Sequence, residues 1–422
     1  MKRSIYWYPV DNAGKIFPAV SKDSRSSVFR LSFYLTETID PVLLEQAVND
    51  MLPRFEPFAV ELKSGLFWYY LSVNKKKAVV KKEDPIVSKF IPWAKNNGYL
   101  FQVFYYENKI TLETFHSLSD GTGAMEFLKS ITYRYLTLLG YSLEHERKIL
   151  GCVPSQNSES LDMFTHSYDN SKKKNIKEEP AYHLSGEKFK DHFTLCVRVG
   201  LKTDELLALA RKHGVTIGEY VTALLAYSIY TEDAASRLTK KPIKIFVPVN
   251  LRRFFPSNTI RNFSLYIKAT YHGRESFTFE RMLQVTKEQF QTQLKKEDLH
   301  ERINSNVGIE KNPFIRILPL SVKNLAFRLG YYYFAENIST CAISNLGPIT
   351  LPDSMKPWIQ DAEFLIGGNC LGIVSLNGCT NIMMNTEFKN LNIIQCFIRT
   401  LVSEGLSVTI DTNYKEGLDE IL

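Results

Sequence analysis

The chain has 422 residues, of which 44% are hydrophobic and 13% aromatic, a composition that can build two or three domains with large buried cores. The formal net charge is +7, from 52 Lys and Arg against 45 Asp and Glu, and no dense basic cluster indicates a nucleic-acid surface. Six cysteines stand singly, without a C-x-x-C pair or a histidine at metal-ligand spacing, so they indicate neither a disulfide framework nor a metal site.

The first residues and the hydropathy pattern indicate in which cellular compartment the protein is expected. Residues 1–9 carry charges but lack the sustained apolar core of a signal peptide. No uninterrupted apolar run reaches the length that spans a membrane. We therefore expect a soluble cytoplasmic protein without a membrane span.

The first half of the chain, residues 1–155, leads up to a single polar turn. Its predicted elements are a structured arm rather than a helix at 7–18, strands at 28–35, 101–106 and 109–115, and helices at 40–51 and 124–138. The last two strands form a hairpin, and the second helix stops at Gly140. Short aromatic-rich strands at 60–80 include Phe67–Tyr70, where exposed aromatic side chains can form an interface.

A polar segment at 156–191 is rich in Ser, Asn, Lys and Glu, and we interpret it as the linker to a second half at 192–422. The predicted strands of the second half are 193–199, 243–249, 262–267, 340–345, 364–366, 372–376 and 381–386, and its helices are 204–213, 217–230, 279–294 and 393–402. The helix at 217–230 begins with a capping box formed by Thr216 and Glu219.

A weak internal echo relates the two halves. Residues 110–123 and the helix after them resemble residues 381–392 and the helix that follows. Two related halves would each present a mixed sheet covered by helices, with a cleft between them. Because only the first half has a histidine at this place, we expect one active site per chain.

The polar turn within Thr111–Gly123 carries the residues best suited to chemistry. His116, Asp120 and Gly121 stand at H-x-x-x-D-G spacing between a predicted strand and a helix. Histidine titrates nearest to neutral pH, so His116 is a candidate general base. The Asp120 carboxylate can cap the turn, accept backbone N–H bonds or pair with an arginine. Gly121 and Gly123 permit a positive φ and a close approach of the backbone to a ligand.

The same residues also allow a purely structural interpretation. His116 can satisfy a hydrogen bond beneath the following helix, and Asp120-Gly121 can be an ordinary turn. The motif taken alone does not decide between the two interpretations.

Three separate stretches resemble one superfamily, the CoA-dependent acyltransferases that include chloramphenicol acetyltransferase, plant BAHD acyltransferases and peptide-synthetase condensation domains. Phe115–Gly121 resembles their H-H-x-x-x-D-G motif, with phenylalanine in place of the first histidine. Residues 247–252, together with Asn262-Phe263, are similar to the segment after the crossover in condensation-like members. Ser344–Pro348 resembles the S-N-x-G segment that lines their tunnel.

Two further observations indicate which branch of the superfamily the chain resembles most. The opening at 8–18 is similar to that of the bacterial alcohol O-acetyltransferase-like proteins. The D-F-G-W-G segment of the plant branch does not occur near the end of the sequence.

The resemblance implies an α/β fold of the α+β type. Two chloramphenicol-acetyltransferase-like lobes, each a mixed sheet covered by helices, would form a pseudo-dimer with a tunnel at their interface. His116 would deprotonate an alcohol or amine acceptor, which attacks the thioester of acetyl-CoA or another short acyl-CoA directly. No acyl-enzyme forms, and acyl-CoA is a substrate rather than a permanently bound cofactor.

The resemblance also assigns partners to the charged residues. Asp120 would pair with an arginine, Arg30 or Arg54, to hold the loop. Arg252 and Arg253 can reach the phosphates of CoA or can equally pair with nearby carboxylates.

The remaining candidates are expected to contact the substrates. Ser344, Asn345 or a backbone amide would stabilise the oxyanion, and the sequence does not choose among them. The residues expected at the substrate or CoA site are Gly121, Gly123, Asn250, Arg252, Ser344 and Asn345.

Two other functions remain open. A condensation-type enzyme would take its acyl group from the phosphopantetheine arm of an acyl carrier protein instead of CoA. A non-catalytic binding module would keep the fold without turnover, although the intact His116 and Asp120 weigh against it.

Overall fold

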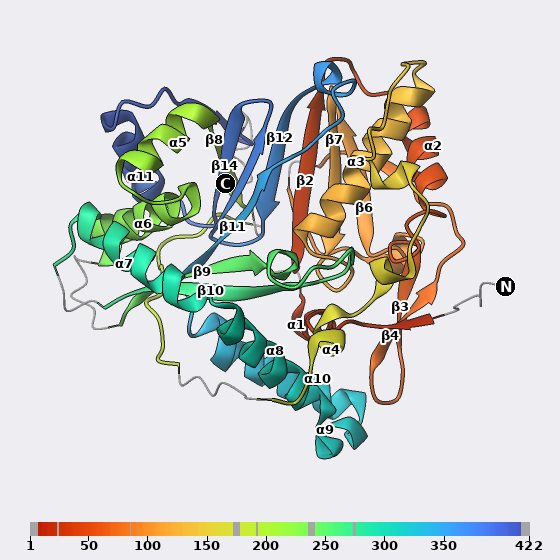
Figure 1. Cartoon of the computed structure of the whole chain (residues 1–422), viewed down its shortest axis with the longest axis horizontal. Helices are drawn as coiled ribbons and strands as arrows, with labels where there is room; N and C mark the ends of the chain where they lie inside the picture. The colour runs from red at the N-terminus through yellow and green to blue at the C-terminus, as the bar shows by residue number, and fades with distance from the viewer. Residues whose placement is uncertain are drawn as a thin grey trace.

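Two mixed β-sheets stand side by side, each with helices packed on its outer face (Figure 1). The structure is a computed structural model that describes residues 7–22, 25–84, 86–171, 178–190, 193–234, 241–272 and 276–414.

The first lobe is built on a five-stranded sheet. Its strands are β2 (Val28–Leu35), β5 (Val80–Lys82), β6 (Phe101–Tyr106), β7 (Lys109–Phe115) and β12 (Ile359–Ile366), in the spatial order β12-β2-β7-β6-β5. The predicted hairpin is β6–β7, and β7 pairs antiparallel with β2 so that Val28 lies opposite Phe115. Both of these central strands are almost wholly buried, and their buried polar side chains pair across the strands, Arg30 with Glu113 and Ser32 with Thr111.

Strand β12 enters the first sheet from the other half of the chain. It lies in the region that we expected in the second lobe, yet it pairs antiparallel with β2 over its whole length. Leu351, Met355 and Phe364 accordingly belong to the hydrophobic core of the first lobe. The two lobes therefore share chain segments.

Two helices, α2 (Pro41–Met51) and α3 (Gly121–Leu138), cover the first sheet (Figure 1). Helix α2 begins where the Asp40 carboxylate accepts backbone N–H bonds from Val42 and Leu43. Helix α3 begins at the end of the polar turn and buries an apolar stripe that includes Phe127.

The second lobe is built on a seven-stranded sheet in the order β10-β9-β11-β13-β14-β8-β15. Its strands are β8 (Leu195–Lys202), β9 (Ile243–Asn250), β10 (Ser264–Tyr271), β11 (Cys341–Pro348), β13 (Cys370–Leu376), β14 (Cys379–Thr386) and β15 (Thr409–Thr412). The helices that pack on it are α5 (Thr203–Lys212), α6 (Ile217–Ile229), α7 (Phe279–Gln293) and α11 (Asn392–Ser403). The succession β14–α11 matches β7–α3, as the internal echo predicts.

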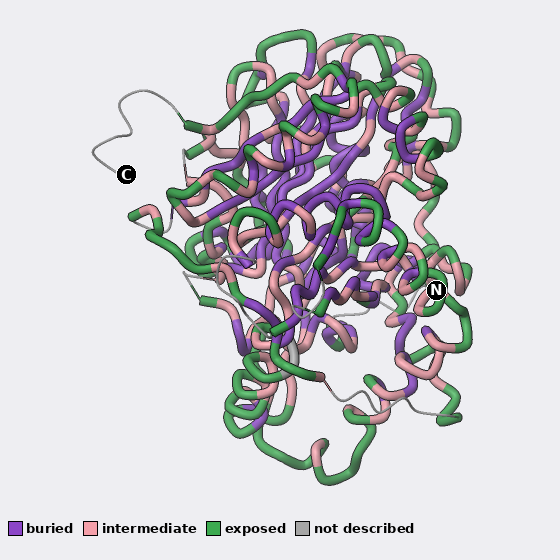
Figure 2. Tube along the Cα trace, turned by 90° about the vertical axis from the view of Figure 1, so that its left-hand side faces the viewer, coloured by how far each residue is buried: buried purple, intermediate pink, exposed green. Residues whose placement is uncertain are grey.

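A third group of elements lies below the two sheets (Figure 1). It comprises a small sheet of β1 (Trp7–Pro9), β3 (Val60–Ser64) and β4 (Tyr69–Val73), and the helices α1 (Phe17–Val20), α4 (Met163–Ser167), α8 (Lys296–Lys311), α9 (Pro313–Ile317) and α10 (Leu320–Tyr331). Figure 2 shows buried residues concentrated around the two large sheets and mostly exposed residues at this lower end.

Three sequence predictions need correction or extension. The arm at 7–18 is partly helical, because Pro18 stands in the first turn of α1. The segment 156–191 is more than a linker, since Met163 and Phe164 of α4 pack against α8; its residues 172–177 and 191 lie outside the described chain. The edge strand β15 was missed because all four of its residues are exposed and give no alternating pattern.

Within the described ranges, no helix combines the length and the apolar character that crossing a membrane requires.

Candidate active site

His116 lies on the turn between β7 and α3, with its backbone N–H donated to the carbonyl of Ser27. Its imidazole is stacked on the ring of Phe17, with the ring centroids 4.6 Å apart. The ring of Phe29 makes an edge-to-face contact with the imidazole, with the ring centroids 5.2 Å apart. Phe115, which stands where the resembled motif has its first histidine, is fully buried in the core of the first lobe. Two aromatic rings therefore fix the plane of the His116 imidazole.

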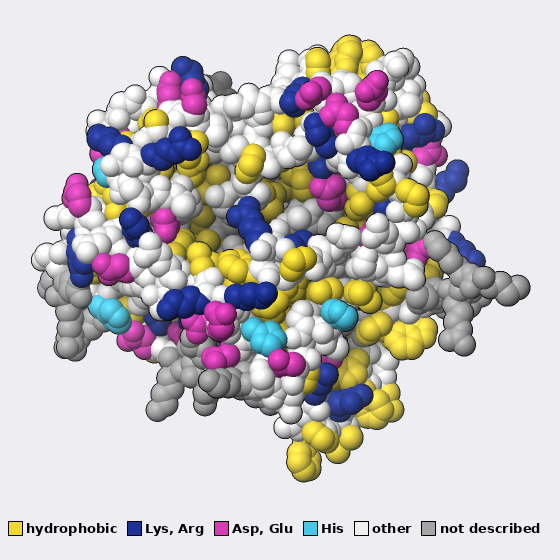
Figure 3. Space-filling model, in the orientation of Figure 1, with side chains coloured by type: hydrophobic (Ala, Val, Ile, Leu, Met, Phe, Trp, Pro, Cys, Tyr) yellow, Lys and Arg dark blue, Asp and Glu magenta, His cyan; other side chains and the backbone are white. Residues whose placement is uncertain are grey.

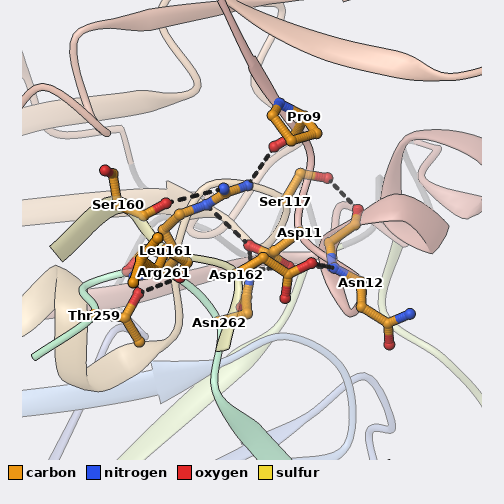
Figure 4. Close-up of polar contacts among 12 residues, drawn as sticks. Pro9, Asp11, Asn12, Ser117, Ser160, Leu161, Asp162, Thr259, Arg261 and Asn262 are labelled. Atoms are coloured by element: carbon orange, nitrogen blue, oxygen red, sulfur yellow. Dashed lines mark hydrogen bonds and ion pairs between the residues drawn. The ribbon is translucent and has the colours of Figure 1, made fainter. Parts of the chain in front are cut away.

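Asn262 links His116 to a buried carboxylate. The Nδ1 atom of His116 lies 3.1 Å from Oδ1 of Asn262. The Nδ2 group of Asn262 donates to the backbone carbonyl of His116 at 2.9 Å and to the carboxylate of Asp11 at 3.2 Å. Asp11 is completely buried, and it also accepts the backbone N–H of Gly14. Figure 4 shows Asp11 between Asn262 and Arg261, whose Nε lies 3.5 Å from the carboxylate.

This arrangement determines the tautomer of the imidazole. Both partners of the Asn262 Nδ2 group, a carboxylate and a carbonyl, can only accept, so the amide must present its oxygen to His116. A neutral His116 then carries its proton on Nδ1 and donates it to Asn262. The lone pair is left on Nε2, and the one ring hydrogen bond that His116 makes to a described side chain is at Nδ1. His116 is only partly buried, so this nitrogen is the one able to accept a proton from a substrate.

The surroundings of the site also set its protonation. Burial lowers the pKa of His116 below the usual value of an imidazole, while the charge of Asp120 opposes that shift. Burial raises the pKa of the Asp11 carboxyl to about 6, while the Arg261 guanidinium beside it acts in the opposite direction. At neutral pH the imidazole is therefore neutral and the Asp11 carboxyl is mostly ionised.

Asp120 joins the two lobes through its carboxylate. Its carboxylate caps α3 by accepting the N–H of Gly123, and it accepts the N–H of Phe263 at 2.9 Å. The guanidinium of Arg252 donates to both of its oxygens, at 2.8 and 3.2 Å. The remaining N–H groups of Arg252 are bonded to Asn250 and to the carbonyls of Thr259 and Arg261. Arg252 therefore has no free donor for a phosphate, contrary to one of our two expectations for it.

The arginines that we expected beside Asp120 lie elsewhere. Arg30 is buried and pairs with Glu113 and Glu83. Arg54 makes a bidentate pair with Glu159. The expectation that Arg30 or Arg54 holds Asp120 is wrong, because strand β2 and the end of α2 direct these side chains to nearer carboxylates.

Gly121 and Gly123 are placed by packing. Neither residue has a positive φ. A Cβ atom on Gly123 would lie 2.0 Å from the carbonyl oxygen of Ile260, so only glycine allows α3 to approach that segment. A Cβ on Gly121 would lie 2.8 Å from a methyl group of Leu346 in β11. The start of α3 is thus wedged between two parts of the second lobe.

The other expected substrate residues lie around this junction. Asn250 donates to the hydroxyl of Thr122 and supports Arg252. Ser344 and Asn345 are on β11, just before Leu346; Ser344 is half-buried and Asn345 is exposed. Arg253 is exposed and remains available to an anionic ligand.

Sequence reasoning did not assign Asp11, Asn262 or Phe17 to the site, although all three lie in stretches that carry the family resemblance. The available signal was a polar residue directly beside an apolar one in each stretch: Asp11 follows Val10, and Asn262 precedes Phe263. All four residues are buried in the structure. No metal centre accompanies them: in the parts of the chain that the structure describes, no three His, Cys, Asp or Glu side chains are grouped to hold an ion.

Comparison with known proteins gives matches in structure alone. No protein-family model and no curated protein matches the sequence. Polyketide synthase associated protein 5 from Mycobacterium tuberculosis is similar with a TM-score of 0.61 and 14% identity, over 96% of this chain and 98% of its own. The TRI3 trichothecene 15-O-acetyltransferase from Fusarium sporotrichioides is similar with a TM-score of 0.58 and 12% identity, over 94% of both chains.

A third similar structure is the starter condensation domain of the rhizomide synthetase RzmA, solved with C8-CoA and Leu-SNAC. Its TM-score is 0.58 at 12% identity, over 93% of both chains. The chain has the two-lobe fold of chloramphenicol acetyltransferase. This chloramphenicol-acetyltransferase-like fold extends over nearly the whole chain, which confirms the fold class that the sequence predicts. At such low identity the likeness shows the fold, and function has to be argued from the site.

Proposed function

We propose that the protein transfers an acetyl or other short acyl group from acyl-CoA to an alcohol or amine, with His116 as the general base. The observation that carries this proposal is the Nδ1–H tautomer imposed by Asn262, which directs the basic Nε2 lone pair away from the protein's own hydrogen bonds. The lowered pKa of His116 keeps that lone pair free at neutral pH. Similar structures include an acetyltransferase and a domain solved with an acyl-CoA, which supports this class of donor.

The reaction needs one base and no covalent intermediate with the protein. Nε2 takes the proton of the acceptor O–H or N–H as that atom forms its bond to the thioester carbonyl carbon. The tetrahedral oxyanion then re-forms the carbonyl, the C–S bond breaks, and the CoA sulfur takes the proton from Nε2. A positioned base contributes about two to four powers of ten in rate. Ser344, Asn345 or a backbone amide near β11 would supply the oxyanion donor, worth roughly two to three more.

The test is CoA thiol release from acetyl-CoA and other short acyl-CoAs in the presence of a panel of alcohols and amines. We expect acceptor-dependent release by the wild type and a loss of about two to four powers of ten in His116→Ala. His183→Ala is the matched control, because His183 is exposed and should leave the rate unchanged. Equal activity of His116→Ala and the wild type would refute the role of His116.

A carrier-protein thioester is the second candidate donor. The similarity to a condensation domain and to a polyketide synthase associated protein favours it. The same assay with an acylated carrier protein in place of acyl-CoA distinguishes the two donors. If neither donor is consumed while CoA still binds, the protein is a binding module on an acyltransferase fold.

A further inference from the structure

The helices α9 and α10 expose an unusual amount of apolar surface. Eight of the nineteen large apolar side chains that are exposed in the described chain lie between residues 314 and 333. At the tip, Phe314 of α9 is 79% exposed and Ile317 is 68% exposed. On α10, Leu325 and Leu329 lie one turn apart on a single outward stripe. Figure 3 shows hydrophobic side chains gathered at the projecting lower end of the molecule, where Figure 1 places α9.

The same stretch is basic throughout. Residues 311–335 contain four cations, Lys311, Arg316, Lys323 and Arg328, and no Asp or Glu. The carboxylates that border the stretch are engaged elsewhere, Glu310 with Lys15 and Glu336 with Arg25. Lys311, Arg316 and Arg328 are exposed. Apolar tips with cations beside them and no compensating carboxylate are typical of helices that lie on a lipid surface.

The turn between β3 and β4 completes this surface. The N–H of Leu320 donates to the carbonyl of Leu66 at 2.9 Å. The ammonium of Lys323 donates to the carbonyl of Phe67 and lies 3.7 Å from the ring centroid of Trp68. Leu66 and Phe67 are themselves exposed. The β3–β4 turn, α9 and α10 therefore form one continuous surface, which we call the basic apolar face.

A cavity indents this face. Its volume is about 810 Å³, and it is lined by aromatic side chains of the β3–β4 turn, by Trp7, by the cations Lys311 and Arg316, and by the ion pair of Lys15 and Glu310. A space with apolar walls and cations at its side suits a chain with an anionic headgroup. Tryptophan and tyrosine, which prefer the boundary between lipid and water, are abundant around it.

We propose that the basic apolar face docks on the surface of an anionic lipid bilayer. The apolar tips of α9 and α10 would enter the boundary of the acyl chains, and the cations would contact the headgroups. The projecting shape of α9 favours a deformable lipid surface over a second protein, which would need a complementary hollow. Charge gives the preference for anionic lipid, since each Lys or Arg near such a surface strengthens binding about fivefold.

The short helix α1 links the basic apolar face to His116. Helix α10 packs against α1, and Nε of Arg328 donates to the carbonyl of Ala19 in α1. Phe17 of the same short helix is stacked on His116. Helix α1 therefore contacts both α10 and the imidazole.

The test is co-sedimentation of the full chain with vesicles of phosphatidylcholine alone and of an equal mixture of phosphatidylcholine and phosphatidylglycerol. We expect binding to the anionic vesicles that is at least about tenfold stronger and that weakens as salt is added. The double variant Phe314→Asp, Ile317→Asp should lose at least about tenfold of it. The double variant Lys311→Glu, Arg316→Glu should lose the preference for anionic vesicles.

Val42→Asp on α2 is the matched control, since Val42 is 74% exposed but lies far from α9, and it should bind like the wild type. Failure of the wild type to bind anionic vesicles would overturn the proposal, as would full binding by the Phe314→Asp, Ile317→Asp variant. The proposal would also be overturned if the protein did not bind vesicles but formed a solution dimer, or a complex with an acidic carrier protein, that this variant abolished. None of these readouts depends on acyl transfer.

Discussion

The neutral amide of Asn262 orients the His116 ring, a role that a carboxylate has in many histidine-based sites. A carboxylate bonded to Nδ1 orients the ring but also raises the histidine pKa through its charge. Asn262 orients the ring without adding charge, and the carboxylate of Asp11 is kept one step further away. The imidazole can therefore be both oriented and weakly basic.

Replacing Asn262 with alanine removes the acceptor of the His116 Nδ1–H. The ring can then adopt the tautomer with its proton on Nε2, so we expect kcat to fall about 10- to 100-fold with little change in KM. The measurement is steady-state kinetics of thiol release. Asn258→Ala, in the same loop but exposed, is the control and should retain full activity. A normal kcat in Asn262→Ala would show that the aromatic rings alone orient His116.

The rate should depend on pH on the acid side. Protonating His116 removes the base, so kcat/KM falls as pH decreases through a pKa that burial holds below the usual imidazole value of about 6.5. Asp11 also takes up a proton around pH 6 and then accepts less well from Asn262. We therefore expect a level profile above neutral pH and an acid limb steeper than one proton would give. In Asp11→Asn, the acid limb of a plot of log(kcat/KM) against pH should have a slope of one. An inflection above pH 7 in the wild type would contradict this account.

At the scale of elements, the close approach of α3 to the second lobe depends on one glycine. In Gly123→Ala the new Cβ meets a backbone carbonyl that cannot rotate away, and we expect a loss of about 1–3 kcal/mol in the free energy of unfolding. In Gly121→Ala the Cβ meets the end of a leucine side chain, which can turn aside. The second variant should change the free energy of unfolding by less than about 1 kcal/mol. Urea unfolding of both variants measures the difference, and equal losses would refute it.

Local patterns predicted the β7–turn–α3 unit well. The strands of the hairpin and the apolar stripe of the helix each have a characteristic period, and a polar turn separates them. Helix α1 is too short to show a period, and the first residues of β12 include Gln360, Asp361 and Glu363, which mask the strand. His116 was found because its motif is local. Its partners were not, because Asn262 and Asp11 meet it only after the chain has folded, 146 residues after it and 105 before it.

At the scale of the molecule, Asp120 and Arg252 form an ionic link between the lobes. Removing the guanidinium in Arg252→Met would leave a buried carboxylate with only backbone partners, and we expect a loss of about 3–5 kcal/mol in the free energy of unfolding. The neighbouring Arg253→Met should leave stability unchanged, because Arg253 is exposed. If Arg253 contacts CoA, its loss raises KM for acyl-CoA. Thermal unfolding and kinetics of the two variants separate these roles.

The overall fold was predicted through the family resemblance, which uses motifs far apart in the chain. The exchange of β12 between the halves was not, because strand pairing over such distances leaves no local pattern. The acceptor stays unassigned for a similar reason, since the residues that shape a substrate site are dispersed along the chain.

The position of β12 also affects how the protein is made. The edge of the first sheet along β2 stays open until residues 359–366 have been synthesised. At ~5–20 residues per second, the ribosome needs roughly 10–50 s to travel from Phe115 to Ile359. During that time β2 presents unpaired backbone groups to chaperones and to neighbouring nascent chains. The first lobe is completed only when most of the second has left the ribosome, so a nascent chain truncated after the first half lacks an intact sheet.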